Sequence, residues 1–159
     1  MAWTAPKTYN ATDVLTAAEM NTYQRDNMLH LNSGGVFTPL TTPLTSTSWD
    51  GDAYSTTGKT LIDLSAVFGA PAGIKAIAVR LQARDSASSN TSNVMLVVSP
   101  NNTVLSFAVG AFPRGLPNDY GSTGSGICPC DANGDIYYQI NASGAGTLDA
   151  TIEIWGYWL

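Results

Sequence analysis

The sequence predicts a mainly β protein, an antiparallel β-sandwich of jelly-roll type preceded by one short N-terminal α-helix. Three observations lead to this prediction. Apolar segments of strand length recur between residues 59 and 157 and are separated by turn residues. Hydrophobic residues make up 44% of the 159 residues and charged residues only 12%, so a sizeable core is available. A capping motif near the N-terminus marks the helix.

The predicted helix begins at a capping box, Thr16-Ala17-Ala18-Glu19. The Thr16 hydroxyl can accept a hydrogen bond from the Glu19 amide, and the Glu19 carboxylate can accept one from the Thr16 amide. Leu15 and Met20 have the spacing of a hydrophobic staple. Because isolated helices shorter than about 12–15 residues are marginal in water, we expect this helix to dock on its own domain or on a partner.

Two arrangements of the helix remain open. Met20, the stripe from Tyr23 to Asn27, and Leu31 recur at spacings of three, four and seven residues. A narrow stripe interrupted by Asn27 is typical of a coiled-coil seam with one polar layer, which specifies register and strand number. The alternative is a helix packed on its own sandwich, with Asn27 hydrogen-bonded to backbone.

An extended connector is predicted after the helix. Ser33-Gly34-Gly35 is a helix stop. Pro39 and Pro43 exclude a central strand from the segment that follows, although an edge strand is possible. The expected organisation is a docking or oligomerisation segment at residues 1–32, a connector at 33–48 and the β-sandwich at 49–159.

Six segments of the β region have strand patterns. Residues 94–98 are continuously apolar, as in a central strand covered on both faces. Pro100-Asn101-Asn102 predicts a hairpin that leads into a strand at 103–109. The remaining strands are expected at 59–64, 74–84, 135–141 and 147–157.

Two loops are expected between these strands. Residues 85–93 are polar, and residues 110–126 form a long irregular excursion. Structureless loops beyond about 12–15 residues are uncommon and often functional. Phe112, Arg114 and Tyr120 in the second loop belong to the residue types that binding surfaces use, so we expect a host- or partner-facing loop there.

The sequence offers little for catalysis, and we expect no enzyme activity and no cofactor. His30 is the one histidine of the chain and lies on the appended helix, away from any Ser or Cys of the β region. Asp119, Asp131, Asp135 and Glu153 could form a carboxylate pair only at a separation that the sequence does not give. Most of the aspartates lie beside Gly or Asn, where turn formation explains them.

Metal sites are not expected either. Asp131-Ala-Asn-Gly-Asp135 lacks the glutamate and flanking helices of a calcium loop, so a hairpin turn at Asn133-Gly134 is the stronger interpretation. Cys128 and Cys130 flank Pro129, which disfavours a disulfide between them. Two reduced thiols are expected, and interchain disulfide or metal chemistry at a symmetry axis is the alternative.

The charge distribution limits the possible partners. The net charge is −5, and the seven Lys and Arg residues are scattered, which argues against nucleic acid. No stretch approaches the roughly 20 apolar residues of a membrane span, and none has the pattern of a signal peptide. We therefore expect a protein that is made in a cytoplasm and is soluble there.

The N-terminal segment also carries a resemblance. Trp3, the Leu-Thr-Ala-Ala-x-Met-Asn run at residues 15–21, and Arg25-Asp26-Asn27 followed by Leu31 resemble the N-terminal segment of small virion proteins of tailed bacteriophages. Such proteins are minor tail, fibre or decoration proteins in which a short N-terminal module precedes a β domain.

The resemblance implies a non-enzymatic structural component of a virion, assembled in a bacterial cytoplasm, with a minor tail or tail-tip protein favoured. Its implied partners are other virion proteins and sister subunits, and a homotrimer is the favoured state. The residues implied in docking or oligomerisation are Trp3, Leu15, Met20, Asn21, Tyr23, Arg25, Asn27 and Leu31.

Two alternatives remain. A capsid decoration or head-fibre protein would have the same layout but contact the capsid. A carbohydrate-binding module for host attachment would stack sugars of a surface glycan on Trp49, Tyr54, Phe112 or Tyr120.

Overall fold

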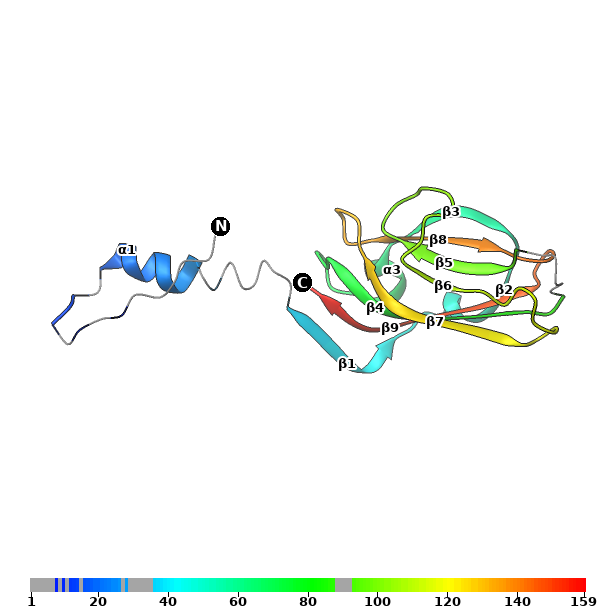
Figure 1. Cartoon of the computed structure of the whole chain (residues 1–159), viewed down its shortest axis with the longest axis horizontal. Coiled ribbons are helices and arrows are strands. Elements are labelled where there is room, and N and C mark those ends of the chain that lie inside the picture. The colour runs from blue at the N-terminus through cyan, green and yellow to red at the C-terminus, as the bar shows by residue number, and fades with distance from the viewer. Residues whose placement is uncertain are drawn as a thin grey trace. The chain divides into compact units, whose positions relative to one another are not determined.

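The computed structural model describes residues 8, 10, 12–14, 16–26, 28, 36–87 and 93–159. It divides into two compact units, Met1–Phe37 together with Leu159, and Thr38–Trp158 (Figure 1). We describe each unit by itself. Among the described helices, none has the length and apolar character needed to cross a membrane.

The first unit contains the helix α1 (Ala17–Met20), which continues as the π-helix η1 (Asn21–Asp26). The capping box is confirmed: the Glu19 amide donates to Thr16 Oγ1 at 3.2 Å, and the Thr16 amide donates to Glu19 Oε2 at 3.0 Å. The wider i→i+5 turn of η1 has a different spacing from the seam of a coiled coil. The choice between a coiled-coil seam and packing on the sandwich stays a prediction. Leu15, Asn27 and Leu31 lie outside the described residues.

The second unit is an antiparallel β-sandwich, as predicted. In one sheet, hereafter the β4 sheet, the order is β1-β9-β4-β7, and β2 also pairs with β9. In the other, the β5 sheet, the order is β3-β8-β5-β6. With β1 and β2 taken together as one edge, this is the strand order of a jelly roll. The strands are β1 (Phe37–Leu44), β2 (Asp50–Tyr54), β3 (Thr57–Ile62), β4 (Ala76–Asp85), β5 (Met95–Ser99), β6 (Val109–Ala111), β7 (Gly121–Pro129), β8 (Ile136–Asn141) and β9 (Leu148–Trp158).

A single hydrophobic cluster fills the space between the two sheets. On β4 and β9 every second residue faces inward, as the alternation predicts, and on β5 Leu96 and Val98 face inward. Trp49 closes the cluster at 5% exposure, stacked on Tyr54 and edge-to-face with Tyr138, both at 4.8 Å between ring centroids.

Two short helical turns connect strands of the body. The 3-10 turn η2 (Thr47–Trp49) carries Trp49 into the core. The helix α3 (Leu64–Phe68), which the sequence analysis did not predict, has Asp63 as its N-cap, with the Ala66 amide donating to Asp63 Oδ1 at 2.9 Å, and ends at Gly69 with φ 67°. Its Leu64 and Phe68 are buried in the core. The strand expected at 59–64 therefore ends at Ile62.

Three segments differ from the prediction. Residues 103–108 are a turn-rich loop rather than a strand, and the hairpin partner of β5 is β6, which begins at Val109. The loop expected at 110–126 contains the end of β6 and the first six residues of β7. The turn at residues 131–135 is present, but it joins β7 to β8 in the opposite sheet and is therefore not a hairpin.

The segment expected as a connector contributes β1, which lies at an edge of the β4 sheet. The edge position agrees with Pro39 and Pro43, since a proline lacks the N–H group that a central strand must donate.

The loop at residues 100–108 is fastened to the outer face of the β5 sheet. Leu105 has φ 63°, a left-handed conformation, and its amide donates to Gln139 Oε1 on β8 at 3.0 Å. Lys59 of β3 donates to the Ser106 carbonyl at 2.6 Å and to the Ser99 hydroxyl, and burial lowers the pKa of Lys59. The loop is therefore held by hydrogen bonds to β8 and to β3.

Candidate functional site

The N-terminal residues predicted for docking are described in part. α1 contains no buried residue, Met20 and Arg25 are exposed, and Tyr23 is half-buried. Asn21 forms the C-cap of α1, and its amide donates to the carbonyls of Ala17 and Ala18. Trp3, Leu15, Asn27 and Leu31 lie outside the described residues. The capping that orders α1 is thus present, and none of the four residues of α1 is buried.

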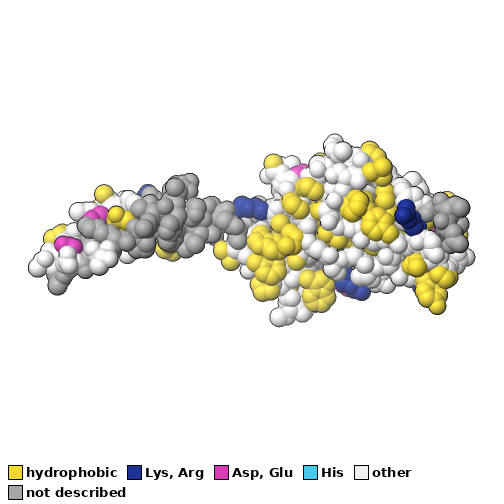
Figure 2. Space-filling view, in the orientation of Figure 1, with side chains coloured by type: hydrophobic (Ala, Val, Ile, Leu, Met, Phe, Trp, Pro, Cys, Tyr) yellow, Lys and Arg dark blue, Asp and Glu magenta, His cyan; other side chains and the backbone are white. Residues whose placement is uncertain are grey.

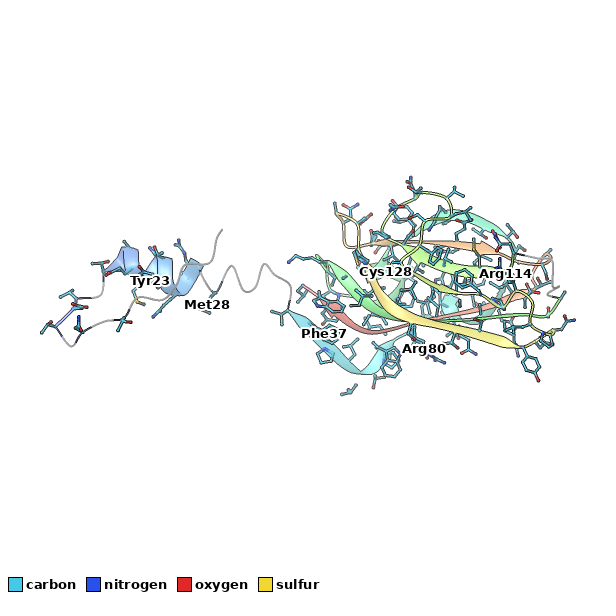
Figure 3. The ribbon with its side chains drawn as sticks, viewed as in Figure 1. Tyr23, Met28, Phe37, Arg80, Arg114 and Cys128 are labelled. Carbon is cyan, nitrogen blue, oxygen red and sulfur yellow. The ribbon has the colours of Figure 1, made fainter. Side chains whose placement is uncertain are left out.

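The three residues predicted for a binding loop contact different groups. The Phe112 ring packs edge-to-face on Phe107 at 5.5 Å, and the Arg114 guanidinium reaches Asn93 Oδ1 at 3.5 Å. Tyr120 is exposed and directly precedes β7. Arg114 lies well apart from Cys128 along the body (Figure 3). The sequence prediction thus named exposed residues, but their contacts do not define one pocket.

Two of the aromatic residues proposed as sugar-stacking platforms have structural roles. Trp49 is buried in the core, so its faces are covered by Tyr54 and Tyr138. Tyr54 is half-buried, its hydroxyl donates to the Ser48 carbonyl, and burial raises its pKa to about 12. Trp49 therefore has no free face for a ligand, and Tyr54 has one face covered by Trp49.

The cysteines are free and lie on or next to β7. Cys128 is buried in the core and its thiol donates to the Pro129 carbonyl, while Cys130 is half-buried. Burial raises the pKa of each thiol to about 12. Neutral thiols are poor nucleophiles and poor metal ligands, so neither cysteine has the character of a reactive site.

The aspartates of the 131–135 turn are engaged with backbone. Asp131 Oδ1 accepts from the amides of Asn133 and Asp135 at 2.8 and 3.0 Å, and Asp135 Oδ1 accepts from the Leu64 amide at 3.0 Å. Among the described residues, no group of three or more His, Cys, Asp or Glu side chains is placed to hold a metal ion.

The outer face of the β4 sheet is the surface on which polar and aromatic side chains converge. Register pairs β4 with β7 on one side and β9 on the other, so outward residues form rows across the three strands. We call this surface the β4 face. Its four rows are Ile127–Ala78–Trp155, Ser125–Arg80–Glu153, Thr123–Gln82–Thr151 and Gly121–Arg84–Asp149.

Trp155 lies on this face by the alternation of β9, which also turns Asp149, Thr151 and Glu153 outward. A β-bulge interrupts the pairing here: Val79 pairs with Ile154 and Ala78 pairs with Gly156, so Trp155 is the extra residue of β9 and has no partner of its own on β4. The Trp155 side chain is exposed, with its indole N–H donating to Glu153 Oε2 at 3.1 Å, which fixes the orientation of the ring.

Two ion pairs flank the middle of the β4 face. Arg80 donates to Glu153 Oε2 at 2.9 Å, and this hydrogen bond lowers the pKa of Glu153. Arg84 donates through Nε to Asp149 Oδ2 at 3.0 Å and also through Nη2, which raises the pKa of Arg84. Figure 3 marks Arg80 on this sheet. Both guanidinium groups are therefore oriented while part of each stays open to solvent.

Two shallow hollows lie along the β4 face. One has an almost wholly apolar lining, from Ala78, Val79, Arg80, Ser125, Gly126, Ile127 and Trp155. The other is mainly polar and is lined by Asp50, Gly51, Gln82, Arg84, Asp149 and Thr151. The β4 face thus combines an apolar hollow beside the exposed Trp155 indole with a polar hollow that offers both hydrogen-bond donors and acceptors. The space-filling view also shows Lys and Arg side chains singly rather than as a stripe (Figure 2).

The β4 face was not predicted as a site from the sequence. The alternation within residues 74–84 and 147–157 predicts which residues of each strand face outward, but not that β4 and β9 are neighbours. A usable signal was the matched order of charges, Arg80 and Arg84 on one strand against Glu153 and Asp149 on the other.

Comparison with known proteins does not assign the site, because no protein-family model matches the sequence and no curated protein matches it.

Proposed function

We propose that this protein is a non-enzymatic structural component of a tailed-phage virion, of the minor tail or tail-tip type, which docks through its N-terminal segment. The observation that carries the proposal is the contrast between the two units. The described core of the sandwich consists of residues from Trp49 to Ile154, whereas α1 has no buried residue.

The capped helix supports a docking role because it is too short to be stable by itself. α1 has 4 residues and η1 has 6, and helices of this size need packing on another surface. The capping box fixes where the helix begins and so presents Met20 in a defined direction. Docking on another virion protein or on sister subunits would supply such a surface.

The sandwich supports a projecting or shell-forming role. Its surface contains few charges, and jelly rolls serve in viral capsid domains as well as in lectins. This is an analogy at the level of fold, and the resemblance of the N-terminal segment carries the choice of a virion.

Particle incorporation tests the proposal. The full chain and a chain lacking residues 1–32 are supplied in trans during infection, and purified particles are probed for each. We expect the full chain in particles and the truncated chain only in the soluble fraction. Equal incorporation of both chains would contradict docking through this segment.

A point variant avoids the effects of truncation. Met20→Asp places a charge on the exposed face of α1, and Val104→Asp makes the same kind of change on an exposed residue of the sandwich. We expect Met20→Asp to reduce incorporation at least tenfold and Val104→Asp to leave it unchanged.

Light scattering on the soluble protein then distinguishes two docking modes. A trimer that becomes a monomer on deletion of residues 1–32 would place the segment at the symmetry axis. A monomer in both cases would make it a docking peptide for another virion protein.

A further inference from the structure

We propose that the β4 face is a binding site for a neutral, extended oligosaccharide, with Trp155 as its stacking platform. This inference is independent of the docking role of the N-terminal segment, because it rests on side chains of β2, β4, β7 and β9 alone.

The apolar end of the face fits the C–H face of a sugar ring. The alternation of β9 turns Trp155 outward, and its hydrogen bond to Glu153 holds the indole at a fixed orientation. Ala78 and Ile127 extend the apolar surface beside the ring, and Ile127 is 57% exposed. A preoriented aromatic ring loses little conformational freedom on binding, which favours affinity for a weakly interacting ligand.

The polar end fits the hydroxyl groups of the same ligand. A sugar hydroxyl both donates and accepts hydrogen bonds, so its site needs both kinds of partner. Arg84 and Gln82 supply donors, and Asp149 and Asp50 supply acceptors, around one hollow. The Arg84–Asp149 ion pair orients two of these groups before any ligand arrives.

The distance between the two ends indicates an extended ligand. Ala78 and Arg84 are six residues apart on β4, which corresponds to about 20 Å at roughly 3.3 Å per residue. A single sugar ring covers only one of the hollows. Several linked rings along the strand direction would contact both.

The charge pattern indicates a neutral ligand rather than a polyanion. Two guanidinium groups face three carboxylates, those of Asp50, Asp149 and Glu153, and the two ion pairs leave no excess positive charge. A sulfated glycan or a nucleic acid requires a net basic surface. A protein partner would have to bury both ion pairs, at a desolvation cost that a hydrated sugar avoids.

Calorimetric titration of the full chain with neutral hexasaccharides tests the proposal. The probes are linear glucan, mannan, galactan and N-acetylglucosamine hexamers, with a sulfated hexasaccharide as the anionic comparison. We expect at least one neutral probe to bind with a dissociation constant between micromolar and millimolar. Absence of binding by every neutral probe, or a preference for the sulfated one, would overturn the proposal.

Variants place the binding on this face. Trp155→Ala should weaken binding at least about tenfold, equivalent to about 1.4 kcal/mol, while Trp155→Phe should lose no more than about threefold. Gln82→Ala should weaken binding at the polar end. The matched control is Phe107→Ala, which removes an exposed aromatic ring of the loop at residues 100–108 on the β5 sheet and should leave the dissociation constant unchanged. Equal binding by Trp155→Ala and the parent chain would exclude the proposed site.

A second copy of the chain is the other occupant that the test can detect. Light scattering over a range of concentrations would then show self-association that Trp155→Ala abolishes, and no oligosaccharide would bind. That outcome would overturn the proposal and make the β4 face an interface between copies.

Discussion

Gly124 of β7 lies where the two sheets come into backbone contact. A Cβ atom at this position would lie 2.0 Å from the Gly110 carbonyl oxygen of β6 and 2.7 Å from its carbonyl carbon. Neither atom can move away as the end of a flexible side chain could. Glycine is therefore required here for close approach of two strands from opposite sheets.

We predict that Gly124→Ala destabilises the protein by about 1–3 kcal/mol or more, because the methyl group forces β6 and β7 apart. Urea unfolding followed by fluorescence measures the change. Gly58→Ala is the matched control, since Gly58 lies on an exposed strand with no atom within 4 Å of the added methyl group. Equal stabilities of the two variants would contradict the close backbone approach of β6 and β7 at Gly124.

Asp85 is a buried carboxylate with several donors. It has 0% exposure and lies at the end of β4, where it accepts from the amides of Ala87 and Ser143 and from the hydroxyls of Ser143 and Thr147. Burial by itself would raise the pKa of Asp85, but these hydrogen bonds outweigh burial and hold the pKa below its usual value. Asp85 thus joins the end of β4 to the turn between β8 and β9.

We predict that Asp85→Asn lowers the free energy of unfolding by about 2–3 kcal/mol at neutral pH. Because the folded-state pKa is depressed, the stabilisation is present above the unfolded pKa of about 3.9 and is lost as pH falls through the lower folded value. The difference in the free energy of unfolding between the parent chain and Asp85→Asn should therefore shrink below about pH 4. Urea unfolding at a series of pH values measures it. Asp52→Asn, at an exposed carboxylate of β2, should show no comparable effect.

At the scale of elements, the strands with clear alternation were predictable. β8 and the long strands β4 and β9 lie within two residues of their predicted bounds. Apolar and polar residues alternate along these strands because one side of each strand faces the core between the two sheets. The sequence pattern of each strand therefore indicates which of its residues are buried. Residues 103–109 were predicted as a strand because they follow a turn, yet the long-range hydrogen bond from the Leu105 amide to Gln139 fastens residues 103–108 as a loop. A contact between residues 34 positions apart has no local signal.

β7 was not predicted, for a different reason. Its residues from Gly121 to Gly126 are Gly, Ser and Thr, which have the composition of a loop. The strand forms because β4 offers a nine-residue pairing partner, Ala76–Arg84, and because Gly124 must be small where β6 crosses. Neighbouring strands therefore determine this element more than its own propensity does.

The loop at residues 100–108 leads to a prediction at this scale. Gln139→Ala removes the acceptor for the Leu105 amide. The hydrogen bond then no longer offsets the conformational strain of Leu105, whose φ is left-handed. We expect chymotrypsin to cleave after Leu105 or Phe107 several-fold faster than in the parent chain. Gln82→Ala, a glutamine on the outer face of the other sheet, is the control. Unchanged cleavage would show that Lys59 and Ser99 hold the loop without Gln139.

At the scale of the whole molecule, the two units should be energetically separate. Because the described core begins at Trp49, deletion of residues 1–32 should leave the midpoint and the steepness of urea unfolding of the sandwich unchanged. Near-ultraviolet circular dichroism should keep the signal of the packed Trp49. A large loss of stability would show that the N-terminal segment belongs to the core and would contradict its role as an independent docking segment.

The candidate site illustrates what a sequence leaves open at this scale. Trp49 was proposed as a sugar-stacking residue because it is aromatic, and burial excludes it. The alternation within residues 147–157 places Trp155 on the same face as Glu153, but its neighbours Ala78 and Ile127 come from strands far away in the sequence. Strand order, which single-sequence patterns do not encode, assembles the β4 face.

The prolines of β1 have a consequence for crowded assemblies. β1 is an edge strand, and Pro39 and Pro43 remove two amide donors from the same side of it. A strand from a neighbouring molecule could therefore not complete a regular ladder along this edge. Many copies held close together, at the local concentrations found on a particle or in an overproducing cell, would thus be protected from merging their sheets into fibrils.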